Sequence, residues 1–277
     1  MARDFKQLVI RKTTPALWRV TFKHAPINLV DYETLDELDA LVADLENSSD
    51  VKVVVFDSAD PDFFLAHWDV AAKRAQDAPQ PAPTWTDIGL RLARAPFVSI
   101  ALIRGRARGM GHEITLGFDM RFASAELAVL GQPEVGIGMI PGGGSLERLP
   151  LLAGRARALE IVLGAADHDA ATAERYGWIN RAVPDKQLDQ FVDELAQRIA
   201  SFDKPALAEA KRVLSRNALP ESQDLEESND AFHKAFAWPG TQARAKTVMQ
   251  LGMGTRGDLE MRLGEYLPTL LTEHAVA

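Results

Sequence analysis

The chain has 277 residues and no cysteine, and its net charge is −8, from 31 basic and 39 acidic side chains. A chain of this length can bury roughly three quarters of its unfolded surface, which allows one large core or two unequal domains. The acidic balance argues against a general polyanion binder, and the lack of cysteine excludes disulfides, thiolate metal sites and a cysteine nucleophile. The mix of 47% hydrophobic and 25% charged residues is typical of an ordinary globular protein.

The first ten residues, MARDFKQLVI, lack the charged-then-apolar pattern of a secretory signal. No apolar run approaches the roughly twenty residues that a membrane helix needs. We therefore expect a soluble, cytoplasmic protein.

The first hundred residues alternate short apolar runs with amphipathic segments. Residues 7–12 and 16–23 are rich in bulky apolar side chains and flank Thr-Thr-Pro, which predicts a hairpin. Residues 31–47 repeat leucine and valine at the helical period after an acidic first turn. The pattern then predicts a strand, a helix and a buried strand, over residues 52–57, 84–93 and 97–103. This alternation indicates an α/β core.

The later part of the chain is mainly helical by pattern. Residues 77–83 are rich in proline and predict a surface loop. The patterns beyond them predict helices over residues 154–164, 169–176 and 185–202, and a short strand over residues 180–183. Helix-forming sequence dominates from Lys204 onward, so we place a domain boundary near residue 201.

Residues 99–149 carry the chemistry. An apolar strand runs into a glycine-rich turn, and a predicted helix start then carries Glu113. A second acid, Glu134, follows in the sequence GQPE, and a PGGG loop comes after it. Closely spaced glycines let backbone N–H groups approach a ligand. Two carboxylates beside such a turn provide the groups for proton transfer next to a developing oxyanion.

With GMGHE, GQPE and IPGGG at this spacing, the segment resembles the active-site region of the enoyl-CoA hydratase/isomerase, or crotonase, superfamily. The stretches APIN and DFFLAHWD and the helix-rich tail fall where that family has its other landmarks. The resemblance implies an α/β fold with a crotonase-like ββα spiral core over residues 1–200. It also implies a helical C-terminal oligomerisation region over residues 201–277 and assembly into homotrimers or dimers of trimers.

The resemblance also implies the reaction. The backbone N–H groups of Trp68 and Met110 would form an oxyanion hole for the thioester carbonyl. Glu113 and Glu134 match the two glutamates with which hydratases of the family activate water and protonate the α-carbon. We therefore expect an enoyl-CoA hydratase-like lyase that adds water across the α,β double bond through an enolate-like state. Neither a metal nor a redox cofactor is implied, and coenzyme A is part of the substrate.

Other interpretations stay open. Glu113 could simply complement a helix dipole, and Glu134 could be a solvated loop acid. The chain could instead be a double-bond isomerase, with Glu134 shuttling a proton, or could run another crotonase reaction. It could also be a non-catalytic acyl-CoA-binding relative, although two buried acids are not needed for binding alone. His112 adjoins Glu113 without metal-ligand spacing, so we expect it to pack behind the glycine turn.

Contacts with coenzyme A are less clearly marked. The resemblance assigns substrate and coenzyme A contacts to six residues, Ala25, Ile27, Ala66, His67, Asp69 and Gly109. Asp69 would brace the oxyanion loop. Three basic residues alternate in this segment, Arg104, Arg106 and Arg108. They could bind phosphates of coenzyme A, or more simply be solvated or form salt bridges within the fold. The tail lacks the family's Phe-x-x-Lys-Arg-x-Pro-like segment, which leaves the recognition of the CoA 3′-phosphate open.

The oxyanion loop departs from the family pattern, because relatives usually have Gly or Ala where this chain has His67 and Trp68. An indole here could shorten or reshape the acyl pocket. His67 could add a titratable group within reach of the carbonyl. The simpler interpretation is that both side chains turn away into a subunit contact.

Overall fold

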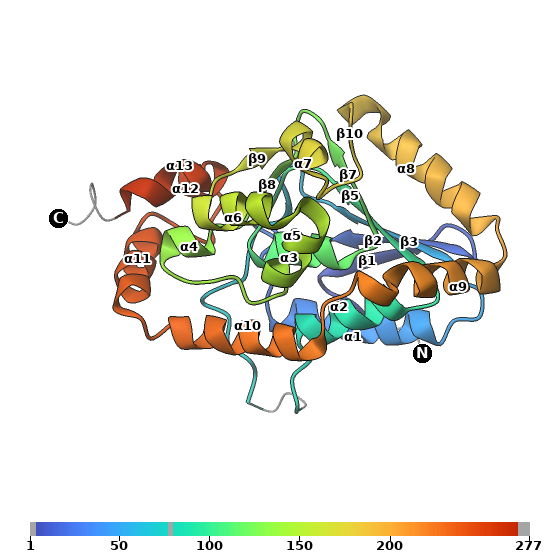
Figure 1. The fold of residues 1–277 in the computed structure, drawn as a ribbon, viewed down its shortest axis with the longest axis horizontal. Helices are drawn as coiled ribbons and strands as arrows, with labels where there is room; N and C mark the ends of the chain where they lie inside the picture. The colour runs from blue at the N-terminus through green and yellow to red at the C-terminus, as the bar shows by residue number, and fades with distance from the viewer. Residues whose placement is uncertain (1–3, 77–79, 271–277) are drawn as a thin grey trace.

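In the computed structural model, which describes residues 4–76 and 80–270, the chain winds between two β-sheets (Figure 1). The larger sheet has the strand order β1-β2-β3-β5-β7-β10, and the smaller has the order β4-β6-β8-β9. The pairs β1–β2 and β8–β9 are antiparallel, and the other pairs are parallel. The strands are β1 (Leu8–Lys12), β2 (Leu17–Phe22), β3 (Val53–Ser58), β4 (Phe63–Leu65), β5 (Val98–Ile103), β6 (Arg106–Arg108), β7 (Met120–Ser124), β8 (Val129–Gly131), β9 (His168–Asp169) and β10 (Arg181–Val183).

Successive strand pairs place one strand in each sheet, as in β3/β4, β5/β6 and β7/β8. This alternation is the ββα spiral, so the predicted fold class is confirmed. All six residues of β5 are buried. Parallel strands that are covered on both faces read as continuous apolar runs, which is why this strand was visible in the sequence.

The helices cover both faces of the larger sheet and one end of the molecule. Their bounds are α1 (Tyr32–Glu46), α2 (Trp85–Arg94), α3 (Met110–Gly117), α4 (Glu134–Ile137), α5 (Ser145–Ala153), α6 (Arg155–Gly164), α7 (Ala170–Tyr176), α8 (Asp185–Ala200), α9 (Lys204–Leu214), α10 (Ser222–Ala235), α11 (Pro239–Gln250), α12 (Asp258–Met261) and α13 (Leu263–Tyr266), with 3₁₀ turns η1 (Ser215–Asn217) and η2 (Leu267–Thr269). The main core joins both sheets to α1 and α2, and a second core lies between the larger sheet and α8.

Local sequence signals set the ends of the first two helices. The side chain of Asp31 accepts a hydrogen bond from Thr34 N–H, and Thr34 Oγ1 accepts one from Asp31 N–H, a reciprocal cap at the start of α1. Thr84 caps the start of α2, where its side chain accepts a hydrogen bond from Asp87 N–H. Both helices therefore begin where the sequence predicted them.

The short strands β4, β6, β8 and β9 escaped prediction, because two or three residues are too few to show a period. Of the predicted loop at 77–83, residues 77–79 lie outside the described part of the chain. The boundary predicted near residue 201 falls in the turn between α8 and α9. Whether the two parts fold separately stays a prediction.

The C-terminal helices lie against the spiral rather than apart from it. Helix α10 contacts α2 and α5, and α11 contacts α4. Figure 1 shows α10 along the lower edge and α11 to α13 gathered at one end. None of the described helices is long and apolar enough to cross a membrane.

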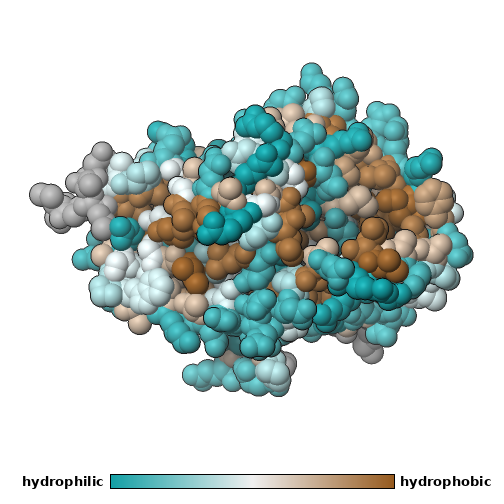
Figure 2. Space-filling model, viewed as in Figure 1, coloured by the Kyte–Doolittle hydropathy of each residue, from teal (hydrophilic) through white to brown (hydrophobic). Residues whose placement is uncertain are grey.

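The face in Figure 2 carries apolar side chains over α5 and α6. Leu151 of α5 and Leu159 and Leu163 of α6 are 55%, 38% and 62% exposed. Apolar groups that gather on a surface in this way mark interaction sites in soluble proteins.

Candidate active site

Glu113 lies in the first turn of α3 and is only 3% exposed. Its Oε1 accepts three hydrogen bonds, from Gly143 N–H at 2.8 Å, Ser145 N–H at 3.1 Å and Ser145 Oγ at 3.0 Å. These donors belong to the PGGG loop and the start of α5, so the loop of the sequence motif closes over the first acid. A Cβ added at Gly143 would lie 2.6 Å from Glu113 Oε2, which explains the glycine.

Glu134 begins α4 and is 9% exposed, so the interpretation of a solvated loop acid is wrong. Its side chain accepts one hydrogen bond from within the described residues, from Gln132 Nε2 to Oε2 at 3.3 Å. Gln132 Nε2 also donates to Ser145 Oγ at 2.9 Å. Because Ser145 Oγ donates to Glu113, the side-chain amide of Gln132 links Glu134 to Glu113 through Ser145. The structure therefore brings together the two predicted catalytic side chains.

Gln132 is a site residue that sequence reasoning missed, although it stands within GQPE. Its Oε1 accepts a hydrogen bond from His112 Nδ1 at 2.6 Å. His112 is fully buried behind the glycine turn, as expected, and packs edge-on against Trp178. Burial lowers the pKa of His112 to about 4, so its ring is neutral and Nδ1 carries the proton.

Burial affects the two acids unequally. Burial raises the pKa of Glu113, but the donors of Ser145 and Gly143 oppose that rise by stabilising the carboxylate. Burial raises the pKa of Glu134 well above its usual range, and the nearby charge of Glu113 raises it further. Glu113 therefore ionises first, and Glu134 holds its proton to higher pH.

The two predicted oxyanion donors, Trp68 and Met110, line one cavity. Met110 is the first residue of α3, so its N–H has no partner within the helix. Within the described part of the chain, neither amide nitrogen has a hydrogen-bond acceptor. A Cβ added at Gly111 would lie 2.1 Å from Leu65 O, so α3 begins in direct contact with the segment that leads to Trp68.

Gly109 supplies the turn before α3. Its φ of +49° and ψ of −127° suit glycine alone. A Cβ there would lie 2.6 Å from Glu134 Oε1 and 3.5 Å from His67 Cβ. The glycine turn thus sets the second acid close to the oxyanion loop.

The cavity has a volume of about 450 Å³. Aromatic and methionine side chains form much of its wall, and both Glu113 and Glu134 open onto it. The aromatic and sulfur-containing wall residues are Tyr32, Trp68, Trp85, Met110, Met139, Phe232, His233, Phe236 and Met253. Those from α10 onward were not predicted, because no local pattern relates the tail to the glycine turn.

Trp68 packs edge-on against Tyr32, with ring centroids 5.0 Å apart and planes at 87°. Its side chain therefore helps to shape the cavity. His67 is buried and forms an ion pair with Glu260 of α12 at 2.8 Å. The interpretation that both residues turn into a subunit contact is wrong for His67, because a carboxylate of the same chain holds the ring.

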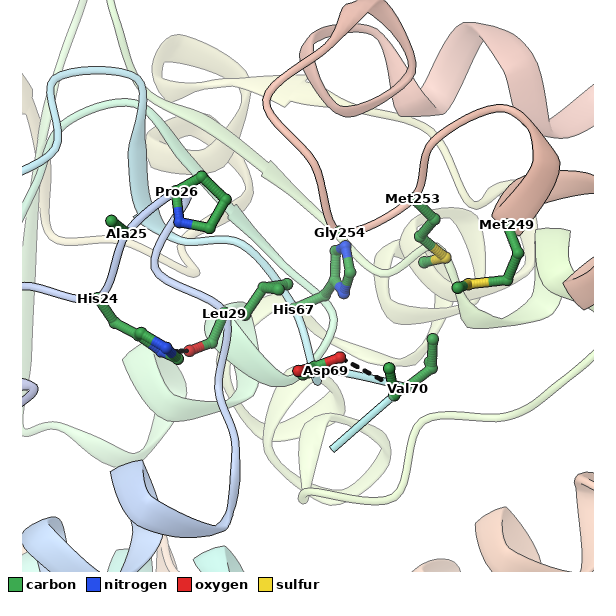
Figure 3. Close-up of a pocket in the computed structure, with 11 residues that line it drawn as sticks. His24, Ala25, Pro26, Leu29, His67, Asp69, Val70, Met249, Met253 and Gly254 are labelled. Atoms are coloured by element: carbon green, nitrogen blue, oxygen red, sulfur yellow. Dashed lines mark hydrogen bonds between the residues drawn. The ribbon is translucent and has the colours of Figure 1, made fainter. Parts of the chain in front are cut away.

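A second cavity, of about 340 Å³, is drawn in Figure 3 and shares His67, Val70 and Met253 with the first. Ala25 and Asp69 line it, and Asp69 Oδ1 accepts a hydrogen bond from Ala71 N–H at 2.8 Å. A bracing role of Asp69 for the oxyanion loop stays a prediction. Ile27 and Ala66 are buried. Ala66 N–H donates to Asn28 O, and its carbonyl accepts from Arg108 N–H, so contacts of Ala66 with coenzyme A stay a prediction.

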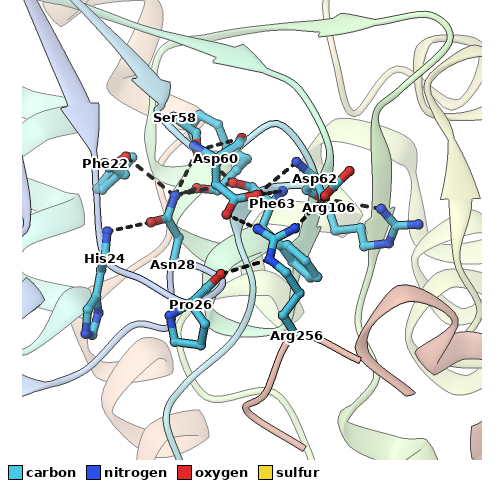
Figure 4. A network of polar contacts seen from close by, with 11 residues as sticks. Phe22, His24, Pro26, Asn28, Ser58, Asp60, Asp62, Phe63, Arg106 and Arg256 are labelled. Atoms are coloured by element: carbon cyan, nitrogen blue, oxygen red, sulfur yellow. Dashed lines mark hydrogen bonds and ion pairs between the residues drawn. The ribbon is translucent and has the colours of Figure 1, made fainter. Parts of the chain in front are cut away.

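The wall beside Ala25 is held by the polar network of Figure 4. Asn28 adopts a φ of +53°, which asparagine tolerates better than most residues, and its Nδ2 donates to Ser58 Oγ at 2.8 Å. Arg256 joins this wall to the tail, with ion pairs to Asp60 and Asp62 and a hydrogen bond from Nε to Pro26 O at 3.3 Å. The APIN segment is therefore fixed from both sides.

The three arginines of the glycine segment serve the fold. Arg104 pairs with Asp185 and Asp189, and Arg108 pairs with Asp167. Arg106 donates from Nε to a carbonyl of α12, that of Met261, at 2.9 Å. The simpler expectation of contacts within the fold is confirmed. Phosphate recognition finds no support in these contacts.

Comparisons with known proteins identify the family. The sequence matches the family described as enoyl-CoA hydratase/isomerase over residues 12–250. It is 31% identical to a short-chain-enoyl-CoA hydratase of Clostridium acetobutylicum over 69% of this chain and 74% of that protein. It is 29% identical to the fatty acid oxidation complex subunit alpha of Vibrio vulnificus, over 86% of this chain but only 36% of that longer protein.

Among solved structures, a candidate enoyl-CoA hydratase from Streptomyces avermitilis superposes with a TM-score of 0.91. It is 39% identical in sequence, and the match covers 97% of this chain and 98% of the other. The similarity therefore includes the C-terminal helices as well as the spiral.

Proposed function

The chain belongs to the enoyl-CoA hydratase/isomerase family, and from this premise we propose that it is a hydratase-like lyase acting on an α,β-unsaturated acyl-CoA thioester. The observation that carries the proposal is the network that joins the two acids through Gln132 and Ser145. The pKa of Glu134 is raised more than that of Glu113, in the direction that hydration requires. One must accept a proton from water, and the other must give one to carbon.

Glu113 is the base. Three donors hold its Oε1 as a carboxylate oxygen, which leaves Oε2 to accept a proton from water. The water oxygen adds to the β-carbon, and the electron pair of the double bond moves toward the thioester carbonyl. Glu134, whose pKa burial and the Glu113 charge raise well above its usual range, then gives its proton to the α-carbon. The substrate thereby gains one water, while one proton has moved from Glu134 to Glu113. Loss of the Glu113 proton to solvent and uptake of one by Glu134 restore the starting state.

The N–H groups of Trp68 and Met110 stabilise the negative charge on the thioester oxygen. Coenzyme A is part of the substrate in this proposal, and its pantetheine would pass along the loop between the two cavities. Removing one such donor typically costs about 10²–10³ in rate, so the reaction depends on both amides.

The aromatic wall supports a bulky or aryl acyl group rather than a short one. A cavity of about 450 Å³ lies in the range of sites that hold drug-sized ligands. Offset or edge contacts between rings contribute about 0.5–1.5 kcal/mol beyond the burial of area. Trp68, Tyr32 and Phe232 are placed to make such contacts.

A double-bond isomerase is the second candidate, because it would use the same oxyanion and a single proton shuttle. The link from Gln132 to both acids favours hydration, since an isomerase needs only one of them. A binding protein would have no use for two buried acids that are linked through Gln132 and Ser145. We also propose that the protein assembles into trimers or dimers of trimers.

The test is turnover of trans-2-enoyl-CoA thioesters, from crotonyl to aryl-substituted acyl groups. Loss of the enoyl absorbance is followed, and the product is identified by mass. Gain of one water is expected. An unchanged mass with a moved double bond would establish the isomerase, and binding without reaction would establish the binding protein.

A further inference from the structure

His67 is buried between the two cavities, with both ring nitrogens bonded. Nδ1 lies 2.8 Å from Trp68 O, and Nε2 lies 2.8 Å from Glu260 Oε1. A carbonyl oxygen and a carboxylate oxygen are both acceptors, so each ring nitrogen carries a hydrogen. The ring is therefore an imidazolium that donates in two directions.

Glu260 is itself held in place. Its Oε1 also accepts Gly254 N–H at 2.7 Å, and its backbone carbonyl accepts from Arg108 Nη1 at 2.5 Å. Arg108 is anchored by Asp167, with two bonds of 2.7 and 2.6 Å. Glu260 Oε2 is buried without a partner in the described residues. The cost of burying the Glu260 charge is therefore offset mostly by its ion pair with His67.

The contacts of His67 bear directly on one oxyanion donor. Val30 N–H donates to His67 O at 2.8 Å, and Asp69 N–H donates to Val30 O at 2.8 Å. In a planar trans peptide the N–H and C=O point in opposite directions, so Trp68 N–H points away from Val30. The next carbonyl, Trp68 O, is taken by the His67 ring. The peptides on both sides of Trp68 are thus fixed.

We propose that His67 is a positioning residue that orients the Trp68 amide toward the thioester oxygen, and that Glu260 holds His67 in that position from the C-terminal segment. This inference rests on the proposed function, because it needs a thioester carbonyl at the oxyanion site. It assigns a role to the histidine of the oxyanion loop. It also makes the tail part of the catalytic geometry.

The electrostatics agree with this arrangement. Burial lowers the pKa of His67, but the Glu260 carboxylate and the Trp68 carbonyl outweigh burial and raise it. Arg108 opposes them. Glu134 lies across Gly109 from His67, and His24 and Asp69 line the second cavity with it. Glu260 has the complementary change, because His67, the Gly254 N–H and Arg108 overcome burial and lower its pKa.

The test uses a chromophoric thioester, para-dimethylaminocinnamoyl-CoA, whose absorption moves to longer wavelength when its carbonyl is polarised. The variants are His67→Ala, His67→Gln and Glu260→Gln. The matched control is Asp119→Asn, which neutralises another carboxylate paired with a buried cation, Lys211, at 2.7 Å outside both cavities. Circular dichroism and thermal melting establish that each variant is folded.

We expect the wild type and Asp119→Asn to shift the chromophore, and the His67 and Glu260 variants to lose most of that shift. Their kcat should fall about 10- to 100-fold while KM changes little, because a misdirected donor weakens the transition state more than the bound substrate. His67→Gln should recover part of the loss, since its amide can still donate to Trp68 O.

An equal shift in wild type and all variants would overturn the inference. Loss of the shift in His67→Ala alone would overturn the role of Glu260. If the wild type shifts the chromophore but adds no water to any thioester, the proposed hydration fails while the positioning role stands. If the wild type binds the probe without any shift, both the oxyanion site and the positioning role are wrong.

Discussion

Glu113 and Glu134 are side chains of the same type, but they differ in their hydrogen bonds. Glu113 has three donors on one oxygen, whereas Glu134 has one long contact. We expect Glu113→Gln and Glu134→Gln each to lower kcat by about 10²–10⁴, the usual contribution of a positioned acid or base. Glu174→Gln, the same change at an exposed position of α7, serves as the control. Unchanged turnover in both site variants would refute the mechanism.

The raised pKa of Glu134 also predicts how stability depends on pH. The folded protein holds this proton at pH values where the unfolded chain has lost it, so the free energy of unfolding falls as pH rises above the ordinary glutamate value. Glu134→Gln has no carboxyl group to titrate, so its free energy of unfolding does not fall in this way. The variant should melt at a higher temperature than the wild type at pH 8, by on the order of 2–4 °C for each kcal/mol recovered. The difference should shrink toward pH 4. A difference that grows in acid would contradict the raised pKa.

The proposed function gives Trp68 two separable roles, one in its backbone and one in its side chain. Trp68→Ala keeps the amide N–H but removes the indole from the cavity wall. We expect the ratio of kcat/KM for bulky over crotonyl thioesters to change at least about tenfold, in the range of pocket discrimination. Tyr32→Phe keeps the ring beside Trp68 and should leave the ratio unchanged. If Trp68→Ala also leaves the ratio unchanged, the indole does not face the acyl group.

At the scale of elements, the predictable parts were those with a local physical signal. β5 is buried throughout and apolar at every position but Ser99, and α1 starts with Asp31 three residues before Thr34. The glycines near Glu113 are likewise local, because close approach of a carboxylate leaves no room for a Cβ. The strands of the smaller sheet gave no signal, since each has only two or three residues.

The unpredicted parts of the site depend on contacts that are distant in sequence. Glu260 lies 193 residues from His67, and no spacing rule relates them. Phe232 meets the PGGG loop closely enough that a Cβ on Gly142 would lie 2.5 Å from Phe232 Cβ. The sequence tail was predicted to be an oligomerisation region. The structure adds that this tail also lines the cavity of its own chain.

Helix α9 illustrates how the tail is attached to the spiral. Lys211 is buried, and its Nζ donates to Leu92 O at 2.8 Å, Phe97 O at 2.7 Å and Asp119 Oδ2 at 2.7 Å. Lys211→Met would leave Asp119 without its cation and two carbonyls without a donor. We expect a loss of about 3–5 kcal/mol in the free energy of unfolding, measured by urea denaturation.

The control for this anchor is Lys204→Met, at the start of the same helix. Lys204 Nζ donates to carbonyls in the turn after α1, those of Ser48 and Ser49, from a half-buried position. Its loss should cost about 1 kcal/mol or less, as for partly exposed contacts. Similar losses for Lys204→Met and Lys211→Met would mean that the ion pair with Asp119 does not anchor α9.

For the whole molecule, the open question is what covers the apolar side chains of α5 and α6. Leu159 and Leu163 lie four residues apart on one face of α6, and Leu151 of α5 is also exposed. We expect this face to be an interface between copies of the chain, with a mass of three or six chains of 30.4 kDa by light scattering. Leu163→Lys should shift the mass toward a single chain, because a charge buried in an interface is costly. Leu127→Lys, at a similarly exposed leucine in the turn between β7 and β8, is the control and should leave the mass unchanged.

Since the side chains around the acyl cavity come from one chain, the dissociated variant should still shift the cinnamoyl chromophore. Loss of that shift on dissociation would mean that a neighbouring chain completes the site.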